Sequence, residues 1–282
     1  MRTIDFTVPQ DLPAQNIKTY LHRFGVSGSL LKTLKNDPNG ILKNGRAART
    51  IDPLLPGDRL QINIPTEGTP PKQSAQKVRI LYQDDDILVA DKPPFMPVHE
   101  SRNHIGDTLA NAVAGELDGA FRSVYRLDRD TSGLVVVAKN SLSAAKLAGQ
   151  CQKTYYAVAQ GVLARPGRIC LPIARMGDSI IKRCVSPRGV YAATNFVPLV
   201  CLHGRTLLQI QLETGRTHQI RVHFAHIGMP LVGDSLYGQA NPQIMRQALH
   251  CGRVSLCHPV TGAHMHFYTA FPPEFMICMR GE

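Results

Sequence analysis

A polar, proline-rich stretch divides this chain of 282 residues into two unequal parts. Residues 65–77 (PTEGTPPKQSAQK) carry almost no apolar side chain, so they are predicted to be a linker. Residues 1–64 suffice for a small binding module, and residues 78–282 form the main domain. Because 43% of all residues are hydrophobic, the chain can bury a substantial core, and general disorder is excluded.

Residues 1–64 have the pattern of a small α+β domain. Apolar spacing over residues 17–24 predicts a helix that ends near Gly25, and the leucines of residues 30–34 predict a second helix. The segment ILKNGR (41–46) contains an Asn-Gly hairpin turn. PGDRLQINI (56–64) then predicts a turn and an alternating strand.

The charge of the chain points to a polyanionic partner. It holds 32 Lys and Arg against 21 Asp and Glu, a net charge of +11, and nucleic acid is the leading candidate. Residues 1–77 hold eleven Lys or Arg and six Asp or Glu, a net charge of +5. The expected phosphate contacts in this part, each with an ordinary solvated basic surface as the alternative, are Lys32, Lys35, Lys43, Arg46 and Arg49.

The cysteines and the hydropathy pattern favour a cytoplasmic setting without a membrane segment. No apolar run approaches the roughly 20 residues of a membrane span, and Met1–Gln10 lack a signal-peptide pattern. The seven cysteines are scattered, without a Cys-x-x-Cys pair, which favours a reduced compartment. Cys251 and Cys257 lie next to His250 and His258 but lack the paired spacing of a zinc site, so we expect no metal there.

Residues 78–282 predict an α+β fold with a mainly antiparallel mixed sheet and flanking helices. Strands and helices are interspersed without regular βαβ repeats or a glycine-rich phosphate loop. RILYQDDDILVADKPP (79–94) predicts two strands joined by an acidic turn. Further strands are expected over 133–139, 154–161 and 206–212, and helices over 142–150 and 217–227.

The stretch YRLDRDTSGLVVVAK (125–139) is the most informative one. An apolar strand follows a Thr-Ser-Gly turn, and Asp128 and Asp130 precede it beside two arginines. A neighbouring arginine favours an ionised carboxylate, which is the form that acts as a nucleophile. An aspartate before a turn also has a purely structural interpretation.

The stretch TGRTHQIRVHFAHIG (214–228) predicts a helix with Thr217 as its N-cap. His218 and Arg221 are three residues apart, so both can point into one cleft. His218, His223 and His226 do not share one helix face and have no acidic residue nearby, so we prefer ordinary histidines to metal ligands.

In KTYYAVAQG (153–161), strand alternation puts Lys153 and Tyr155 on one face and Tyr156 on the other. A cation beside a tyrosine suits stacking on a base in a chain that has no Trp. A half-buried strand tyrosine is the alternative.

Together these stretches closely resemble the RluA-type pseudouridine synthases. That family typically has His-Arg-Leu-Asp-x-x-Thr-Ser-Gly, Lys-x-Tyr and Gly-Arg-Thr-His-Gln-Ile-Arg-x-His in this order, matched here by YRLDRDTSG, KTY and GRTHQIRVH. DKPPFMPVH, GDSLYG and LHCGRVSLCHPVTG extend the match over nearly all of residues 78–282. Residues 1–64 resemble the RNA-binding domain named after ribosomal protein S-four. Two positions depart from the family pattern: Tyr125 stands where His is frequent, and Phe95 where Gly is usual.

The resemblance implies an RNA pseudouridine synthase that needs no metal or cofactor. It implies that Asp128 is the nucleophile, that Arg221 keeps it charged, and that Tyr155 stacks on the target uracil. Arg126 is expected to enter the RNA helix and help hold the uridine out of its stack. Further substrate contacts are implied for Lys153, Arg216 and His218. We expect a monomer with an RNA partner, ribosomal RNA being favoured and transfer RNA an alternative.

Two other functions fit part of the pattern. Asp128-Arg129-Asp130 resembles the motif of magnesium-dependent aspartyl phosphatases, but Ser132 replaces the required Thr and Arg126 interrupts the preceding strand. A non-catalytic RNA-binding or ribosome-assembly factor fits the net charge equally well. Binding alone, however, needs none of the three presumed catalytic side chains.

Overall fold

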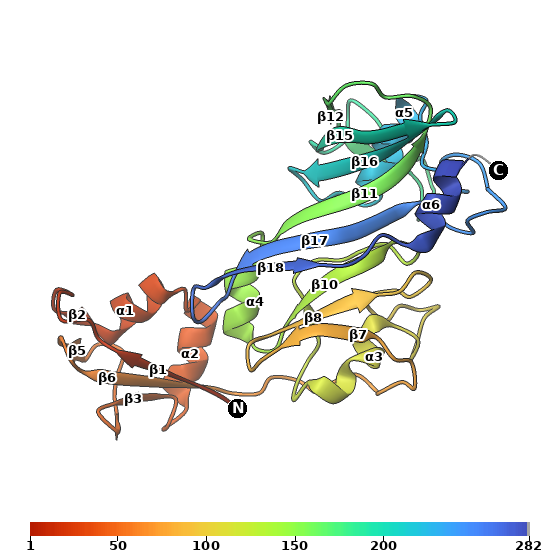
Figure 1. The fold of residues 1–282 in the computed structure, drawn as a ribbon. Coiled ribbons are helices and arrows are strands. Elements are labelled where there is room, and N and C mark those ends of the chain that lie inside the picture. Colours follow the sequence, from red (N-terminus) through yellow and green to blue (C-terminus); the bar gives the residue numbers. More distant parts are fainter. Residues whose placement is uncertain (281–282) are drawn as a thin grey trace.

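The computed structural model describes residues 1–280 and contains two bodies, each with its own sheet (Figure 1). The smaller body consists of the first 64 residues, and the larger one begins at Arg79. Residues 65–77, predicted to be a linker, contain no helix or strand, although several of them contact the larger body. Among the described residues, no helix is long and apolar enough to cross a membrane.

The smaller body confirms the helices, hairpin and final strand that the sequence predicts. α1 (Ile17–Phe24) is capped by the Asn16 side chain and ends at Gly25 in a left-handed conformation, and Ser27 caps α2 (Gly28–Asn36). Both helices pack their leucines against a sheet with strand order β1-β6-β3-β4. Its strands are β1 (Arg2–Thr7), β3 (Ile41–Lys43), β4 (Arg46–Ala47) and β6 (Arg59–Ile64), and β2 (Gln15–Asn16) pairs with β5 (Pro53–Leu54) beside it.

The larger body is built on one sheet of ten strands. The strand order is β12-β15-β16-β11-β17-β10-β8-β7, with β18 beside β17 and β9 beside β10. Every pair in it is antiparallel except β10 with β17, which confirms the mainly antiparallel sheet. The strands are β7 (Arg79–Gln83), β8 (Ile87–Lys92), β9 (Arg122–Ser123), β10 (Ser132–Ala138), β11 (Gln152–Gln160), β12 (Gly167–Cys170), β15 (Ala193–Leu202), β16 (Arg205–Leu212), β17 (Leu249–Cys257) and β18 (His264–Tyr268).

Helices and a small hairpin flank this sheet. β13 (Ile173–Arg175) and β14 (Arg183–Val185) form a separate two-stranded hairpin that packs against α5. The helices are α3 (Leu109–Ala112), α4 (Ser141–Leu147), α5 (Gln219–His226) and α6 (Pro273–Arg280), with a 3-10 turn over Ala114–Glu116.

β10 is an uninterrupted apolar run because it lies inside the sheet. All seven of its residues are buried, because strands β8 and β17 flank it and side chains cover both faces. Gly133 has a φ of +114°, and a Cβ there would collide with the backbone of Cys251 on β17. This close approach fixes the end of β10 that follows the turn carrying Asp128.

Contacts between the two bodies hold the smaller one against α4 and the turn between β7 and β8. Leu142 of α4 belongs to the apolar core of the smaller body, and Lys146 lies 3.8 Å from the ring centre of Phe24. Arg2 donates to both oxygens of the buried Asp86, at 3.0 and 2.7 Å. Apolar packing and a buried ion pair therefore join the two bodies.

Candidate active site

The turn that carries Asp128 is held by two buried basic side chains. Lys92, which is fully buried, donates to the carbonyl oxygen of Arg129 at 2.9 Å, and Arg246 donates to that of Asp130 at 3.2 Å. Burial lowers the pKa of Lys92 to about 7. The Thr131 amide donates to the Asp128 carbonyl at 3.1 Å and closes the turn. The backbone beneath Asp128 is thus fixed independently of its carboxylate.

Arg221, in the first turn of α5, bridges two carboxylates. Its Nη1 donates to Asp128 Oδ2 at 3.2 Å, while its Nε and Nη2 donate to the two oxygens of Asp234 at 2.7 and 2.9 Å. Burial lowers the pKa of Arg221, but the two aspartates outweigh it, so the pKa is raised above the ordinary value. Arg221 is therefore always charged, and Asp234 fixes its direction.

His218 lies at the start of the same helix and also approaches Asp128. The sequence pattern predicted Thr217 as the N-cap, which was wrong: His218 occupies the cap in a left-handed conformation (φ 57°), and no side chain caps the helix. The Tyr237 hydroxyl accepts the Arg183 amide at 2.9 Å, so its proton can be donated to His218 Nδ1 at 2.8 Å. The remaining ring proton then sits on Nε2, 3.8 Å from Asp128 Oδ2. Burial lowers the pKa of His218, which favours this neutral form.

β11 lies opposite Asp128. Lys153 and Tyr155 line one hollow, which confirms the prediction that they share a face of this strand. Tyr156 packs on the other side of the sheet, against a separate apolar cluster. Tyr155 is 6% exposed, and burial raises its pKa well above the ordinary value, so the phenol stays protonated. The Lys153 ammonium lies 4.6 Å from the ring centre of Tyr125, whose hydroxyl donates to Leu134 O at 2.9 Å.

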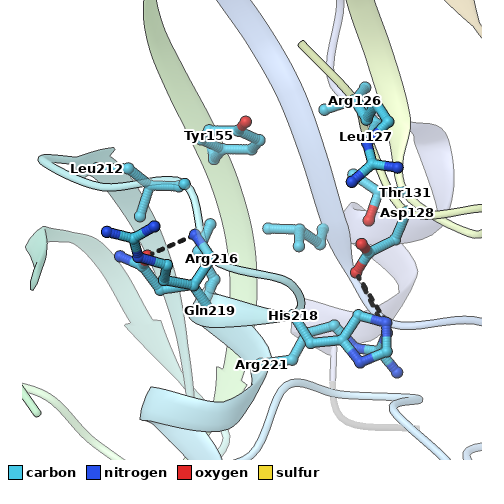
Figure 2. Close-up of a pocket in the computed structure, with 13 residues that line it drawn as sticks. Arg126, Leu127, Asp128, Thr131, Tyr155, Leu212, Arg216, His218, Gln219 and Arg221 are labelled. Carbon is cyan, nitrogen blue, oxygen red and sulfur yellow. Dashed lines mark hydrogen bonds and ion pairs between the residues drawn. The ribbon is translucent and has the colours of Figure 1, made fainter. Parts of the chain in front are cut away.

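These elements line an open pocket of about 440 Å³ (Figure 2). Figure 2 shows Asp128 beside His218 and Arg221, with Tyr155 across the pocket from them. Of the seven catalytic and substrate residues expected from the sequence, six line this pocket: Arg126, Asp128, Tyr155, Arg216, His218 and Arg221. Lys153 lines the larger adjoining hollow instead. The structure therefore brings together side chains that lie up to 95 residues apart in the sequence.

The five basic residues of the smaller body that were expected to contact phosphate have unequal surroundings. Lys43 donates to the Pro53 carbonyl at 2.7 Å and pairs with Asp58 at 3.0 Å, and Arg49 pairs with Asp52 at 3.2 Å. Lys32, Lys35 and Arg46 are exposed, and none of them is in an ion pair with a described residue. Lys32, Lys35 and Arg46 are therefore the members of this set most available to contact phosphate.

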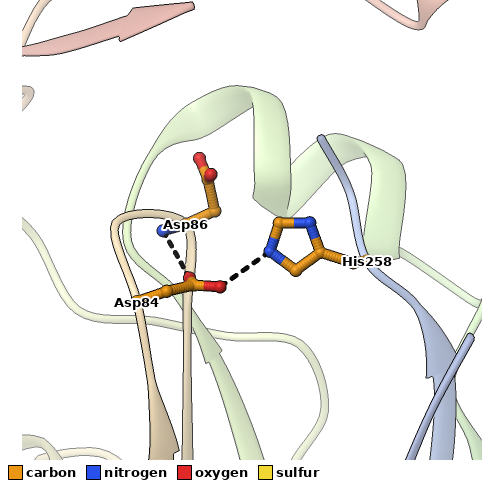
Figure 3. Close-up of side chains that lie close together, drawn as sticks. All are labelled: Asp84, Asp86 and His258. Carbon is orange, nitrogen blue, oxygen red and sulfur yellow. Dashed lines mark hydrogen bonds and ion pairs between the residues drawn. The ribbon is translucent and has the colours of Figure 1, made fainter. Parts of the chain in front are cut away.

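A second polar cluster joins Asp84, Asp86 and His258 at the junction of the two bodies (Figure 3). His258 Nδ1 accepts the amides of Val260 and Thr261, so Nε2 donates to Asp84 at 2.9 Å. Asp86 accepts from Arg2 and Asn140. These groups are therefore engaged in protein hydrogen bonds, and His258 does not pair with the neighbouring cysteine considered for zinc.

Two residues of the site were missed by the sequence analysis. Asp234 and Tyr237 belong to GDSLYG (233–238), a stretch that supported the family resemblance without being assigned to the site. Asp234 is 1% exposed and orients Arg221, while Tyr237 orients His218. The available signal for Asp234 was an acidic residue in a family motif that forms no strand or helix, which indicates a role in the site.

The two departures from the family pattern have different local consequences. The Tyr125 ring makes a cation–π contact with Lys153, and its hydroxyl donates to the Leu134 carbonyl. Phe95 has a φ of 63° and is 54% exposed. The left-handed region is unfavourable for a bulky side chain, which explains why glycine is usual there.

Comparisons with known proteins agree with this geometry. A family model described as RNA pseudouridylate synthase matches residues 86–226. An uncharacterised RNA pseudouridine synthase of Bacillus subtilis is 37% identical, covering 94% of this chain and 99% of the relative. Ribosomal large subunit pseudouridine synthase D of Pseudomonas aeruginosa is 38% identical, covering 71% of this chain and 70% of the relative.

The solved structure of human RNA pseudouridylate synthase domain containing 1 superposes with a TM-score of 0.61 at 26% identity, covering 73% of this chain and 89% of that one. Neither the phosphatase nor the non-catalytic factor is favoured by these matches. The chain belongs to the RluA-type family of RNA pseudouridine synthases.

Proposed function

We propose that this pseudouridine synthase modifies large-subunit ribosomal RNA with Asp128 as its nucleophile. The observation that carries the proposal is the asymmetry of the Asp128 carboxylate. Arg221 and His218 both approach Oδ2, whereas Oδ1 has no hydrogen-bond partner among the described residues. Oδ2 is therefore held by the Arg221 cation, with His218 nearby, and Oδ1 is available to form a bond.

The surrounding side chains have complementary roles in this proposal. Arg221 pairs with Asp128, and Asp234 keeps Arg221 from turning away. In this proposal the Tyr155 phenol stacks on the uracil, because burial raises its pKa and keeps it protonated, so no phenolate is present to act as a base. Arg126 is exposed at the rim of the pocket and of the larger adjoining hollow, which suits contact with the RNA from which the uridine has been flipped.

The choice of target comes from the relatives and the smaller body. Several relatives are named as ribosomal large subunit pseudouridine synthases. Residues 1–64, as an S-four-like RNA-binding domain, would add salt-sensitive affinity through Lys32, Lys35 and Arg46. We propose that the enzyme acts as a cytoplasmic monomer without metal or cofactor.

Pseudouridine mapping of total RNA tests this function. Cells lacking the protein are complemented with wild type or with Asp128→Ala. We expect one site or a small cluster in large-subunit rRNA to disappear, and only wild type to restore it. Loss of transfer-RNA sites instead would refute the target, and survival of every pseudouridine would refute the function in the cell.

A further inference from the structure

Besides the larger hollow that adjoins the reaction pocket, a second hollow of about 510 Å³ lies beside it. The β13–β14 hairpin, the segment after it and the residues before α5 form its walls. Arg183, Arg216 and Thr217 line both this hollow and the larger one that contains Asp128. The two hollows are therefore neighbours with a common wall, so one RNA strand passing over these residues can reach both.

Four arginines border the second hollow: Arg175, Arg183, Arg188 and Arg216. Among the described residues, none of them is in an ion pair with a carboxylate, whereas Arg168 on neighbouring β12 is paired with Glu213 at 2.8 Å. The hairpin and the segment after it, residues 173–190, contain a single acidic residue, Asp178, which does not line the hollow. The positive charge of the hollow is thus not neutralised from within.

Backbone carbonyls orient two of these arginines. Arg183 Nη1 donates to the carbonyls of Ile180, Ile181 and Lys182 at 3.1–3.3 Å, and Arg216 Nε donates to that of Tyr191 at 3.1 Å. These neutral acceptors fix the guanidinium groups without cancelling their charge. The remaining N–H groups stay available to a ligand.

The hairpin is also fixed relative to the catalytic carboxylate. Ile173 and Val185 pack with Val222 of α5. The Arg183 amide donates to Tyr237, which in turn bonds His218. A ligand held at Arg183 is therefore placed at a defined position relative to Asp128.

We propose that this hollow binds a phosphodiester group of the substrate RNA next to the flipped uridine. Guanidinium groups bind phosphate oxygens in pairs, which suits a cluster of unpaired arginines. The RNA strand would pass over Arg183 and Arg216 on its way into the pocket, with Arg175 and Arg188 on the adjacent phosphate. The proposal rests on the proposed RNA substrate and adds the place where its backbone is held.

The test compares the double variant Arg175→Ala/Arg188→Ala with the matched double variant Arg165→Ala/Arg253→Ala. All four arginines are exposed, and the control pair lies outside both hollows. The probe is an unmodified transcript of large-subunit rRNA, bound by the full-length protein at several salt concentrations. Melting temperatures of both variants confirm that each is folded.

We expect the hollow variant to bind about tenfold more weakly or worse at 0.1 M salt than the control variant. The slope of log affinity against log salt should become shallower by about 0.7 to 0.9 for each lost phosphate contact. At saturating enzyme, the single-turnover rate of pseudouridine formation should stay within about twofold of wild type, because these arginines position the RNA without touching the reacting atoms.

Binding and salt slope equal to those of the control variant would overturn the proposal, as would a lowered maximum rate with unchanged binding. If wild type makes no pseudouridine in this transcript while the binding difference persists, the proposed target fails and the phosphodiester site stands. The two ideas can therefore fail separately.

Discussion

Replacing Asp234 with asparagine tests whether the ion pair behind the pocket sets the position of Arg221. The Asp234 side chain is 0% exposed, and its oxygens also accept the amides of Leu236 and Tyr237 at 3.1 and 3.2 Å. Asparagine keeps the shape but removes the charge. Its amide N–H groups would face the Arg221 guanidinium, which has no acceptor to offer.

The size of the effect follows from these contacts. Removing one partner of a buried ion pair costs about 3–5 kcal/mol. The Asn oxygen retains a hydrogen bond worth about 1 kcal/mol, and Asp128 still gives Arg221 a carboxylate. We therefore expect a loss of about 2–3 kcal/mol, which lowers the Tm by roughly 5–10 °C in a domain of this size. Since Arg221 would shift toward Asp128, kcat should fall about 100-fold while KM for RNA changes little.

Calorimetry and steady-state pseudouridine formation measure the two effects in the same preparation. Asp118→Asn is the matched control, because Asp118 is exposed and lies outside the pocket. A variant of Asp234 that keeps the wild-type Tm and a kcat within twofold of wild type would refute the positioning role.

Three further changes test the fold around the site. Gly133→Ala should lower the free energy of unfolding by about 3 kcal/mol in urea titration, because φ is +114° and the Cβ meets the Cys251 backbone; a loss below about 1 kcal/mol would contradict this. Phe95→Gly should raise the free energy of unfolding by about 1 kcal/mol, because the left-handed backbone (φ 63°) is unfavourable for Phe and its ring is 54% exposed; destabilisation would contradict this. Burial lowers the pKa of His250 to about 4, so its contribution is complete above pH 6.5 and is lost as pH falls toward 4. Wild type should then lose about 2–3 kcal/mol more than His250→Gln between pH 7.5 and 4.5, and parallel pH dependences would contradict this.

Local signals predicted most of the helices and strands near the site. Apolar spacing placed α1 and α2, and the Asn-Gly pair placed the β3–β4 turn. Continuous apolar runs gave β8 and β10. These elements form from contacts between residues close in sequence, so short windows carry enough information.

Long-range pairing and strained backbone conformations could not be predicted from short sequence windows. The parallel pair β10–β17 joins Ser132 to His250, which no local pattern specifies. Arg221 meets Asp128 across 93 residues, and that pairing was expected only from the family resemblance. Asp234 was missed because Arg221, the charged partner that gives it a role in the site, lies 13 residues away. Thr217 was the wrong N-cap because local spacing does not reveal the left-handed backbone conformation of His218.

The most direct test of the central claim is single-turnover pseudouridine formation by Asp128→Asn and Asp128→Ala on an unmodified large-subunit rRNA transcript. Both variants should bind the transcript within about threefold of wild type, because Asp128 contributes no positive charge to RNA binding. Both should form pseudouridine at least about 1,000-fold more slowly, because an amide or a methyl group cannot attack. Near-wild-type rates in either variant would contradict the account and place the nucleophile elsewhere.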